Sequence, residues 1–425
     1  METVRLDREI HHTTAANGVV VLSERVAHVR SAAVGVWVRT ASAHEPRPKM
    51  GVSHLLEHMV FKGTERRTAQ QIALELEARG GSLDAYTSRD STAFQARVLD
   101  ADLPRAVDVL TDIVRRPVLR DHDLSLERNV VLEEISTVED TPDDLVFELL
   151  ASTLWPEHPY GFSILGTRDT VGALSADDLK QLHGQAYFPG NCVIAAAGNL
   201  THEGLLEELG QQGWLTGEAG RGKGGGAPPP LPPVPAAVRG LTSRHARDTA
   251  QTHIVIATDS VSFADRRKYA LMVLSNILGG GMSSRLFQRI REELGLAYAV
   301  YSYASFYREI GVLGTYVGTQ PAAAERATAA ILEEYGRLAR EGLRGEALAE
   351  AKRQTAGQLM LSLESPTARM YRLAGFALHG ERYLSLDEMV ATVEGLTEDE
   401  VGAVAAEFFA PGRQTTVWLG PEDRR

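Results

Sequence analysis

The sequence contains a single cysteine, Cys192, among its 425 residues. One thiol cannot form an intrachain disulfide framework, and it cannot supply a thiolate-rich metal site. No apolar run approaches the roughly 18 residues that a membrane-spanning helix requires. The N-terminal stretch carries acidic residues and no apolar segment, which is not the pattern of a secretory signal peptide. We therefore expect a cytoplasmic protein with no membrane partner.

An excess of positive charge is also missing. The chain has 44 Lys and Arg residues against 56 Asp and Glu residues, which gives a formal net charge of −12. Nucleic-acid binding that is independent of sequence requires a positive surface, so we expect no nucleic-acid partner. Apolar residues make up 44% and charged residues 24% of the chain, as in ordinary globular proteins. The length predicts two or three domains.

A segment rich in glycine and proline divides the chain. It runs from Gly213 to Gly240 and reads GWLTGEAGRGKGGGAPPPLPPVPAAVRG. Its glycine-rich part is typical of a flexible linker, and its proline-rich part is typical of an extended one. The alternative is a long surface loop within one domain, but loops of this length are uncommon in compact domains. We predict domains over residues 1–212 and 241–425, joined by a hinge over 213–240.

The two halves repeat the same pattern of elements. LSADDLKQLHGQAYFPGNCVIAAAGNL from Leu174 and LTEDEVGAVAAEFFAPGRQTTVWLGP from Leu396 both predict a helix, a Pro-Gly stop and a strand. The segments that begin at Ala69 and Ser284 both predict a helix, a glycine turn and two strands. We infer an α+β fold of two similar, duplicated domains. Each would be a mostly antiparallel sheet flanked by helices, and the two would face each other across a cleft.

The stretch HLLEHMVF, which begins at His54, is the most informative motif. At about 100° per residue, His54, Glu57 and His58 share one face of a helix, while Leu55 and Leu56 turn towards a core. Two imidazoles one turn apart can bind zinc, and the carboxylate between them can take a proton from water that the metal activates. The order inverts the H-E-x-x-H motif, and the inverted form is also catalytic. By itself the pattern also fits a polar helix face with two unpaired histidines.

A catalytic zinc site needs a third protein ligand. Candidates lie in ERNVVLEEI, which begins at Glu127. Glu127 and Glu134 are two helical turns apart and face the same way, whereas Glu133 is rotated by about 100° and cannot share the role of Glu134. In isolation, such an acidic helix face is typical of a solvated surface.

HLLEHMVFKGT followed downstream by ERNVVLEEI resembles the inverted-zincin family that contains mitochondrial processing peptidase, pitrilysin and insulin-degrading enzyme. The resemblance covers nearly the whole chain, and the length and layout are those of the shorter bacterial processing-peptidase-like members. It implies that His54, His58 and Glu134 bind zinc and that Glu57 is the general base. It further implies that Glu127 assists the orientation of a histidine or of the metal site.

The second half has no counterpart of the metal motif. When Gly63 is aligned with Gly279, the residues opposite the two histidines and the glutamate are Ala270, Val273 and Leu274. One zinc ion per chain is therefore expected. The glycine triplet at Gly279 is not followed by G-K-[ST], so it does not predict a phosphate-binding loop.

The second half contains RIREELGLAY, which resembles an Arg and Tyr pair of the family, here Arg291 and Tyr298. In family members these residues come from the far domain and contact the substrate at the zinc site. The resemblance implies that Arg291 binds a substrate carbonyl and that Tyr298 stabilises the oxyanion of a tetrahedral intermediate. The residues alone leave another interpretation open, in which Arg291 pairs with Glu292 and Tyr298 packs in a core.

GGSLDAYTSRDSTAF, from Gly80, is similar to the substrate-binding edge strand of the family. The similarity implies that backbone groups near Ala85, Tyr86 and Thr87 pair with an extended peptide by β-augmentation. An ordinary internal strand is the alternative.

The sequence thus predicts a zinc endopeptidase whose partners are extended peptides or unfolded polypeptides. The alternative is a non-catalytic or partner-dependent subunit of the same fold that binds peptides or supports an assembly. Because one chain carries both the metal motif and the Arg–Tyr element, we expect a self-sufficient enzyme or a homodimer. A heterodimer with a related subunit is the other arrangement considered.

Overall fold

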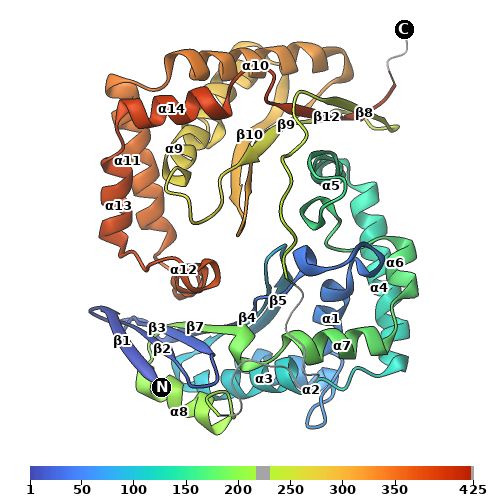
Figure 1. Ribbon diagram of the computed structural model, residues 1–425, viewed down its shortest axis with the longest axis vertical. Helices are drawn as coiled ribbons and strands as arrows, with labels where there is room; N and C mark the ends of the chain where they lie inside the picture. Colours follow the sequence, from blue (N-terminus) through green and yellow to red (C-terminus); the bar gives the residue numbers. More distant parts are fainter. Residues whose placement is uncertain (217–229, 423–425) are drawn as a thin grey trace. The chain divides into compact units, whose positions relative to one another are not determined.

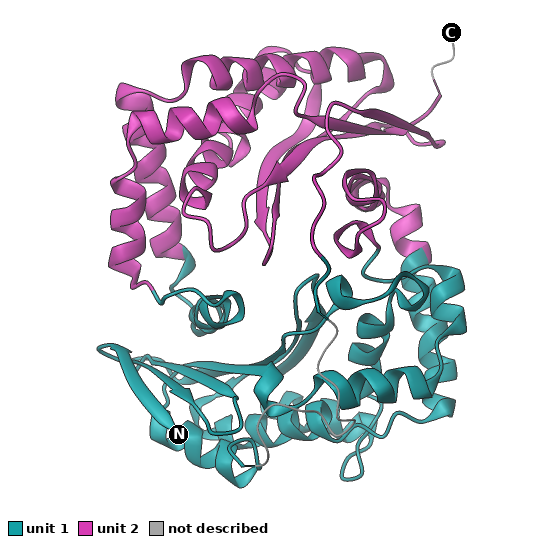
Figure 2. Cartoon of the chain, viewed as in Figure 1, with its two compact units in different colours: residues 1–135, 163–232, 362–383 teal, residues 136–162, 233–361, 384–425 magenta. Residues whose placement is uncertain are grey.

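The computed structural model describes residues 1–216 and 230–422, and Figure 1 labels its helices and strands. Part of the predicted hinge, residues 217–229, lies outside the described residues. The chain forms two compact units (Figure 2). Unit 1 consists of Met1–Ile135, Ser163–Pro232 and Ser362–Tyr383, and unit 2 of Ser136–Phe162, Pro233–Leu361 and Leu384–Arg425.

Unit 1 is built on a seven-stranded sheet with the order β1-β2-β3-β7-β4-β6-β5. Strands β3 and β7 are parallel, and all other neighbours are antiparallel. The strands are β1 Glu2–Asp7, β2 Ile10–Thr14, β3 Val20–Arg25, β4 Ser31–Val38, β5 Ser82–Thr87, β6 Thr92–Leu99 and β7 Cys192–Gly198.

Unit 2 is built on a five-stranded sheet with the order β10-β11-β9-β12-β8. Strands β8 and β12 are parallel, and the other neighbours are antiparallel. The strands are β8 Thr242–Ala246, β9 Thr252–Ser260, β10 Ala297–Phe306, β11 Gly311–Thr319 and β12 Thr415–Gly420.

The two sheets share one topology. The spatial order β3-β7-β4-β6-β5 in unit 1 corresponds, strand by strand, to β8-β12-β9-β11-β10 in unit 2. In both sets the first two strands form the single parallel pair. Unit 1 adds the β1-β2 hairpin at one edge. The predicted fold class, an α+β protein with two duplicated domains, is confirmed.

Helices cover both faces of the sheet in unit 1, because both faces of its central strands are apolar. On one face Val34 and Val36 of β4 pack in a core with residues of α1 and α3, and on the other Trp37 packs with Met370 and Leu373 of α12. The helices of this unit are α1 Val52–Val60, α2 Ala69–Glu77, α3 Leu103–Arg115, α4 Asp121–Asp140, which extends into unit 2, α6 Arg168–Ala173, α7 Ala176–Ala186, α8 His202–Gln211 and α12 Pro366–His379.

Unit 2 has the corresponding arrangement. Ile254 and Ile256 of β9 pack in a core with α9 and α10, and Phe147 of α5 stacks on Tyr316 of β11. The helix predicted after Ser284 includes a π-helix, Phe287–Glu293. The other helices are α5 Pro142–Leu154, α9 Lys268–Gly279, α10 Ala324–Glu341, α11 Gly345–Ser362, α13 Leu386–Glu394 and α14 Glu398–Phe408. Short 3₁₀ turns lie at Ser42–His44, Arg47–Lys49, Asp100–Asp102, Pro159–Gly161, Pro189–Asn191 and Pro321–Ala323.

Two helices are exchanged between the halves of the chain. Helix α12 comes from the second half but packs on β3, β7 and β4 of unit 1, and α5 comes from the first half but packs on β9 and β12 of unit 2 (Figure 2). The compact units therefore differ from the predicted contiguous division at residues 213–240. No helix in residues 1–216 or 230–422 is long and apolar enough to span a membrane.

Candidate metal centre

Helix α1 carries the HLLEH motif and begins directly after Gly51. Gly51 has a φ of 87°, and a Cβ there would lie 2.5 Å from the carbonyl oxygen of Leu165, so this turn requires glycine. Buried Glu45 accepts hydrogen bonds from the backbone N–H groups of Gly51 at 2.8 Å and Ser53 at 2.7 Å. Burial raises the pKa of Glu45 to about 7, although its hydrogen bonds oppose the rise. Glu45 therefore fixes the first turn of α1 beside His54.

The three predicted ligands converge on one point. Nε2 of His54 lies 3.5 Å, and Nε2 of His58 lies 3.6 Å, from Oε2 of Glu134. One ligand atom from each residue lies within 4.8 Å of the other two. In the described part of the chain, no other three or more His, Cys, Asp or Glu residues come together in this way. The two histidines come from α1 and the glutamate from α4.

The residues present fit a zinc ion. Oε2 of Glu134 is buried, yet no described residue donates a hydrogen bond to it. A buried acceptor without a donor is costly, and a bound cation would remove that cost. Two histidines and a glutamate are a known ligand set of catalytic zinc, which leaves a coordination position for water or substrate.

The electrostatics of the two histidines differ. Burial, together with neighbouring His58, lowers the pKa of His54 to about 3, so this imidazole is neutral and able to bind a metal. Burial also lowers the pKa of His58, but its hydrogen bond to Glu127 and the nearby carboxylates outweigh burial and raise the pKa overall. Nδ1 of His58 donates to Oε1 of Glu127 at 2.9 Å, which leaves Nε2 directed at Glu134.

Glu127 lies behind His58 and is itself held in place. Its side chain is buried, and Nζ of Lys62 lies 2.5 Å from Oε2. Burial raises the pKa of Glu127, but the hydrogen bonds from His58 and Lys62 outweigh burial and lower it overall. Glu127 is therefore an ionised acceptor that orients one imidazole. The motif did not indicate Lys62.

Glu57 lies on the same helix face but takes no part in the three-residue cluster. It is 8% exposed, and burial raises its pKa against a hydrogen bond from Thr87. Oγ1 of Thr87 donates to Oε2 of Glu57 at 2.6 Å. A carboxylate with a raised pKa beside a candidate metal site suits general acid–base chemistry.

The strand that contains Ala85, Tyr86 and Thr87 is an edge strand and not an internal one. β5 pairs with β6 alone in the described sheet, so the outer edge of β5 has no neighbouring strand. Its side chains alternate: Ala85 packs against the core beneath α1, whereas the hydroxyl of Tyr86 accepts a hydrogen bond from Nε1 of Trp37 on the other face. The edge that the family resemblance implies for peptide pairing therefore belongs to a strand that contacts α1, the helix that carries Glu57.

Arg291 and Tyr298 belong to unit 2. Arg291 lies on the π-helix, and its guanidinium carbon is 4.5 Å from the ring centroid of Tyr298 and 4.7 Å from that of Phe287. Its Nη1 donates to the carbonyl oxygen of Tyr298 at 3.3 Å. The Tyr298 side chain is 77% exposed, so it does not pack in a core, and Arg291 is also 3.7 Å from Glu292. The two predicted recognition residues therefore lie next to each other.

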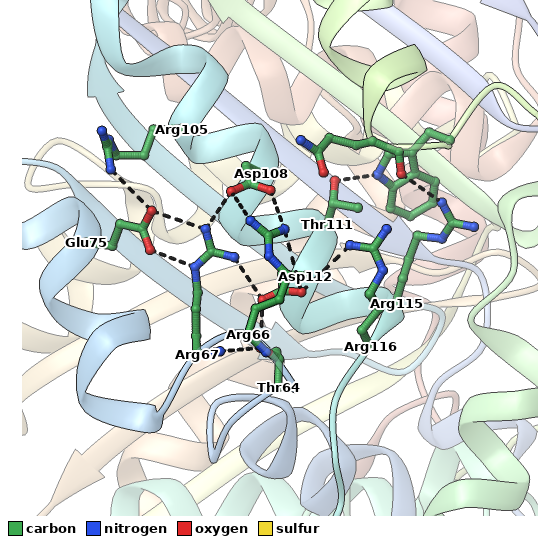
Figure 3. A network of polar contacts seen from close by, with 12 residues as sticks. Thr64, Arg66, Arg67, Glu75, Arg105, Asp108, Thr111, Asp112, Arg115 and Arg116 are labelled. Atoms are coloured by element: carbon green, nitrogen blue, oxygen red, sulfur yellow. Dashed lines mark hydrogen bonds and ion pairs between the residues drawn. The ribbon is translucent and has the colours of Figure 1, made fainter.

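A network of ion pairs holds the segment that leaves α1 (Figure 3). Arg67 is 8% exposed and contacts three carboxylates: Glu75 at 2.6 Å, Asp108 at 2.5 Å and Asp112 at 2.8 Å. Oγ1 of Thr64 donates to the fully buried Asp112 at 2.7 Å. The network ties the loop between α1 and α2 to α3, and the sequence motifs did not indicate it.

The duplicated α+β fold, with two histidines and a glutamate on one helix and a further glutamate on a later helix, defines the inverted-zincin class of metallopeptidase. Comparison with family models gives the particular family. Residues 20–168 match the model described as Insulinase (Peptidase family M16), and residues 173–355 match the model described as Peptidase M16 inactive domain. The chain belongs to peptidase family M16.

Similar proteins from two bacteria match almost the whole chain. An uncharacterized zinc protease of Bacillus subtilis, YmxG, is 37% identical over 94% of this chain and 96% of its own length. An uncharacterized zinc protease of Streptomyces coelicolor is 36% identical over 97% of this chain and 90% of its own length. These relatives support membership of the zinc-protease family.

Solved structures show the same fold. The crystal structure of a protease from Helicobacter pylori matches with a TM-score of 0.89 at 22% identity and covers 96% of this chain and 99% of its own. The crystal structure of a peptidase M16 inactive domain from Pseudomonas fluorescens matches with a TM-score of 0.87 at 21% identity, over 97% and 98% of the two chains. At these identities the likeness concerns the fold alone.

Proposed function

We propose that this protein is a zinc-dependent endopeptidase that hydrolyses extended peptides or unfolded segments of polypeptides. The observation that carries the proposal is the convergence of His54, His58 and Glu134 around a buried carboxylate oxygen that has no described hydrogen-bond donor. Membership of the M16 family and the names of the relatives support it.

We propose one zinc ion per chain. In unit 2, helix α9 occupies the topological position of α1, between the strands that correspond to β4 and β5. The positions aligned with the two histidines and the glutamate hold Ala270, Val273 and Leu274, and all three are buried in an apolar core. These three positions of α9 therefore provide no side chain that could bind a second metal ion.

Each residue of the site has a separate role in the proposed reaction. When bound, zinc polarises the scissile carbonyl and a water molecule. Glu57 accepts a proton from the attacking water and later donates a proton to the leaving amine. The outer edge of β5 pairs with the peptide backbone, which holds the scissile bond in register. Arg291 and Tyr298 contact the substrate, and Tyr298 donates a hydrogen bond to the developing oxyanion.

The test pairs metal analysis with cleavage of a mixed peptide library by the purified full chain. We expect close to one zinc ion per chain, cleavage that a chelator abolishes, and recovery when zinc is restored. Glu134→Gln should lose zinc and activity together, because it removes the charged ligand. Glu133→Gln is the matched control, because it changes the adjacent residue on the same helix. A purified chain that binds zinc but cleaves no peptide would instead favour the non-catalytic subunit.

The proposed role of Tyr298 predicts a separate effect. Tyr298→Phe should lower kcat by about 10²-fold, since removing one oxyanion donor typically costs 10²–10³-fold, and zinc content should not change. Tyr301→Phe on the same strand is the control, because Tyr301 is also exposed and carries no proposed role. An unaltered kcat in Tyr298→Phe would remove this hydroxyl from the mechanism.

The homodimer or heterodimer expected from the sequence stays a prediction.

A further inference from the structure

The two oxygens of the Glu57 carboxylate have different surroundings. Oε2 accepts the hydrogen bond from Oγ1 of Thr87 at 2.6 Å. No residue in 1–216 or 230–422 donates a hydrogen bond to Oε1. A proton acceptor must present one oxygen to the reacting water at hydrogen-bond distance. The contact with Thr87 thus leaves Oε1 as the oxygen that can face the reacting water.

Backbone hydrogen bonds hold the turn that follows Thr87. Thr87 is the last residue of β5, and the hairpin to β6 closes through a hydrogen bond from N–H of Ser88 to the carbonyl of Ser91 at 2.9 Å. The turn is attached to the segment before α1, because N–H of Ala43 donates to the carbonyl of Arg89 at 2.8 Å. The turn that follows Thr87 is therefore linked through its backbone to the segment that leads into α1. Such support keeps a catalytic group within a narrow range of orientations.

We infer that Thr87 is a positioning residue of the proposed peptidase: its hydroxyl turns the Glu57 carboxylate so that Oε1 is the oxygen that receives the proton. The inference rests on the proposed function. The proton leaves the attacking water for Oε1 and passes from there to the leaving amine. Thr87 keeps its own proton throughout, because its hydroxyl only donates a hydrogen bond to Oε2.

The position of Thr87 adds a consequence for substrate binding. The residue that orients Glu57 lies at the end of β5, and the outer edge of β5 is the edge proposed to pair with the peptide. One strand would thus align both the scissile bond and the general base. A change at the Thr87 hydroxyl should affect the chemical step, because backbone pairing to the peptide does not use that side chain.

The test compares Thr87→Val with Thr87→Ser in the full-length, zinc-loaded chain. Valine is close in shape to threonine and is also β-branched, so it suits a strand but cannot donate a hydrogen bond. We expect Thr87→Val to lower kcat by about 10–100-fold, the range typical of losing a hydrogen bond that orients a side chain at a metal site, with KM and zinc content unchanged. Thr87→Ser keeps the donor and should restore most of kcat. A residue with a merely structural role would not give this difference between the two variants.

Thr14→Val is the matched control, because Thr14 is exposed at the end of β2 in the same sheet and pairs there with Glu2 and Val20, which have no proposed role. The inference is wrong if Thr87→Val retains kcat, or if Thr87→Val and Thr87→Ser are impaired equally. In either case, the proposed function would still hold if the wild-type chain cleaves peptides and the Glu57→Gln variant does not. A wild-type chain that binds zinc and cleaves nothing would overturn the proposed function together with the inference.

Discussion

Glu57→Gln is expected to abolish peptide cleavage while the protein keeps its zinc. The amide has nearly the shape of the carboxylate and can still accept the Thr87 hydrogen bond through its carbonyl oxygen, but it cannot take a proton from water. Loss of a general base typically costs 10²–10⁴-fold in rate, so kcat should fall by about that factor. Because Glu57 is outside the ligand cluster, the zinc content per chain should stay at the wild-type value.

The measurement is kcat on a cleaved library peptide together with zinc content for each variant. Glu77→Gln serves as the control, because it makes the same chemical change on an exposed residue at the end of α2. Full activity in Glu57→Gln would reject Glu57 as the base. Simultaneous loss of zinc would instead mean that this carboxylate helps to hold the metal.

Among the substitutions considered, Arg67→Met should cause the largest loss of folding stability. The substitution keeps much of the apolar stem but leaves three carboxylates without their shared partner, and Asp112 is fully buried. Removing one partner of a buried ion pair costs about 3–5 kcal/mol, because the remaining charge stays desolvated. The free energy of unfolding should fall by that amount. Urea unfolding, followed by circular dichroism and by tryptophan fluorescence, measures it.

Arg244→Met provides the comparison. Arg244 pairs with Glu325 at 2.5 Å, but both side chains are at least half exposed, at 50% and 71%. Exposed pairs contribute about 0–1 kcal/mol, so this variant should unfold close to the wild-type urea concentration. Equal effects of Arg67→Met and Arg244→Met would show that the Arg67 network adds no more than an ordinary surface pair.

Features with a regular period could be predicted from the sequence. The helical period places His54, Glu57 and His58 on one face, and the structure has them on one face of α1. The same period separated Glu134 from Glu133, and Glu134 is the residue that joins the histidines. The duplication was visible because both halves contain the same succession of helices, turns and strands, and both sheets have the same strand order.

Features that depend on contacts between distant residues could not be predicted. Glu45 lies in the proline-rich stretch HEPRPK and resembles any exposed loop carboxylate, yet it is buried and caps α1. The Thr87 hydroxyl belongs to a strand whose alternation shows only which face the side chain joins. Helices α5 and α12 have apolar faces, but an apolar face does not specify which sheet will cover it.

The exchange of α5 and α12 makes the duplicated halves mutually dependent for their folding. A fragment ending at residue 240 would contain every strand of the seven-stranded sheet, but Leu22, Trp37 and Val193 on one face would be exposed to water without α12. The same fragment would carry α5 with no β9 or β12 to pack against. Fragments severed at the linker should therefore aggregate when produced singly and complement each other when produced together.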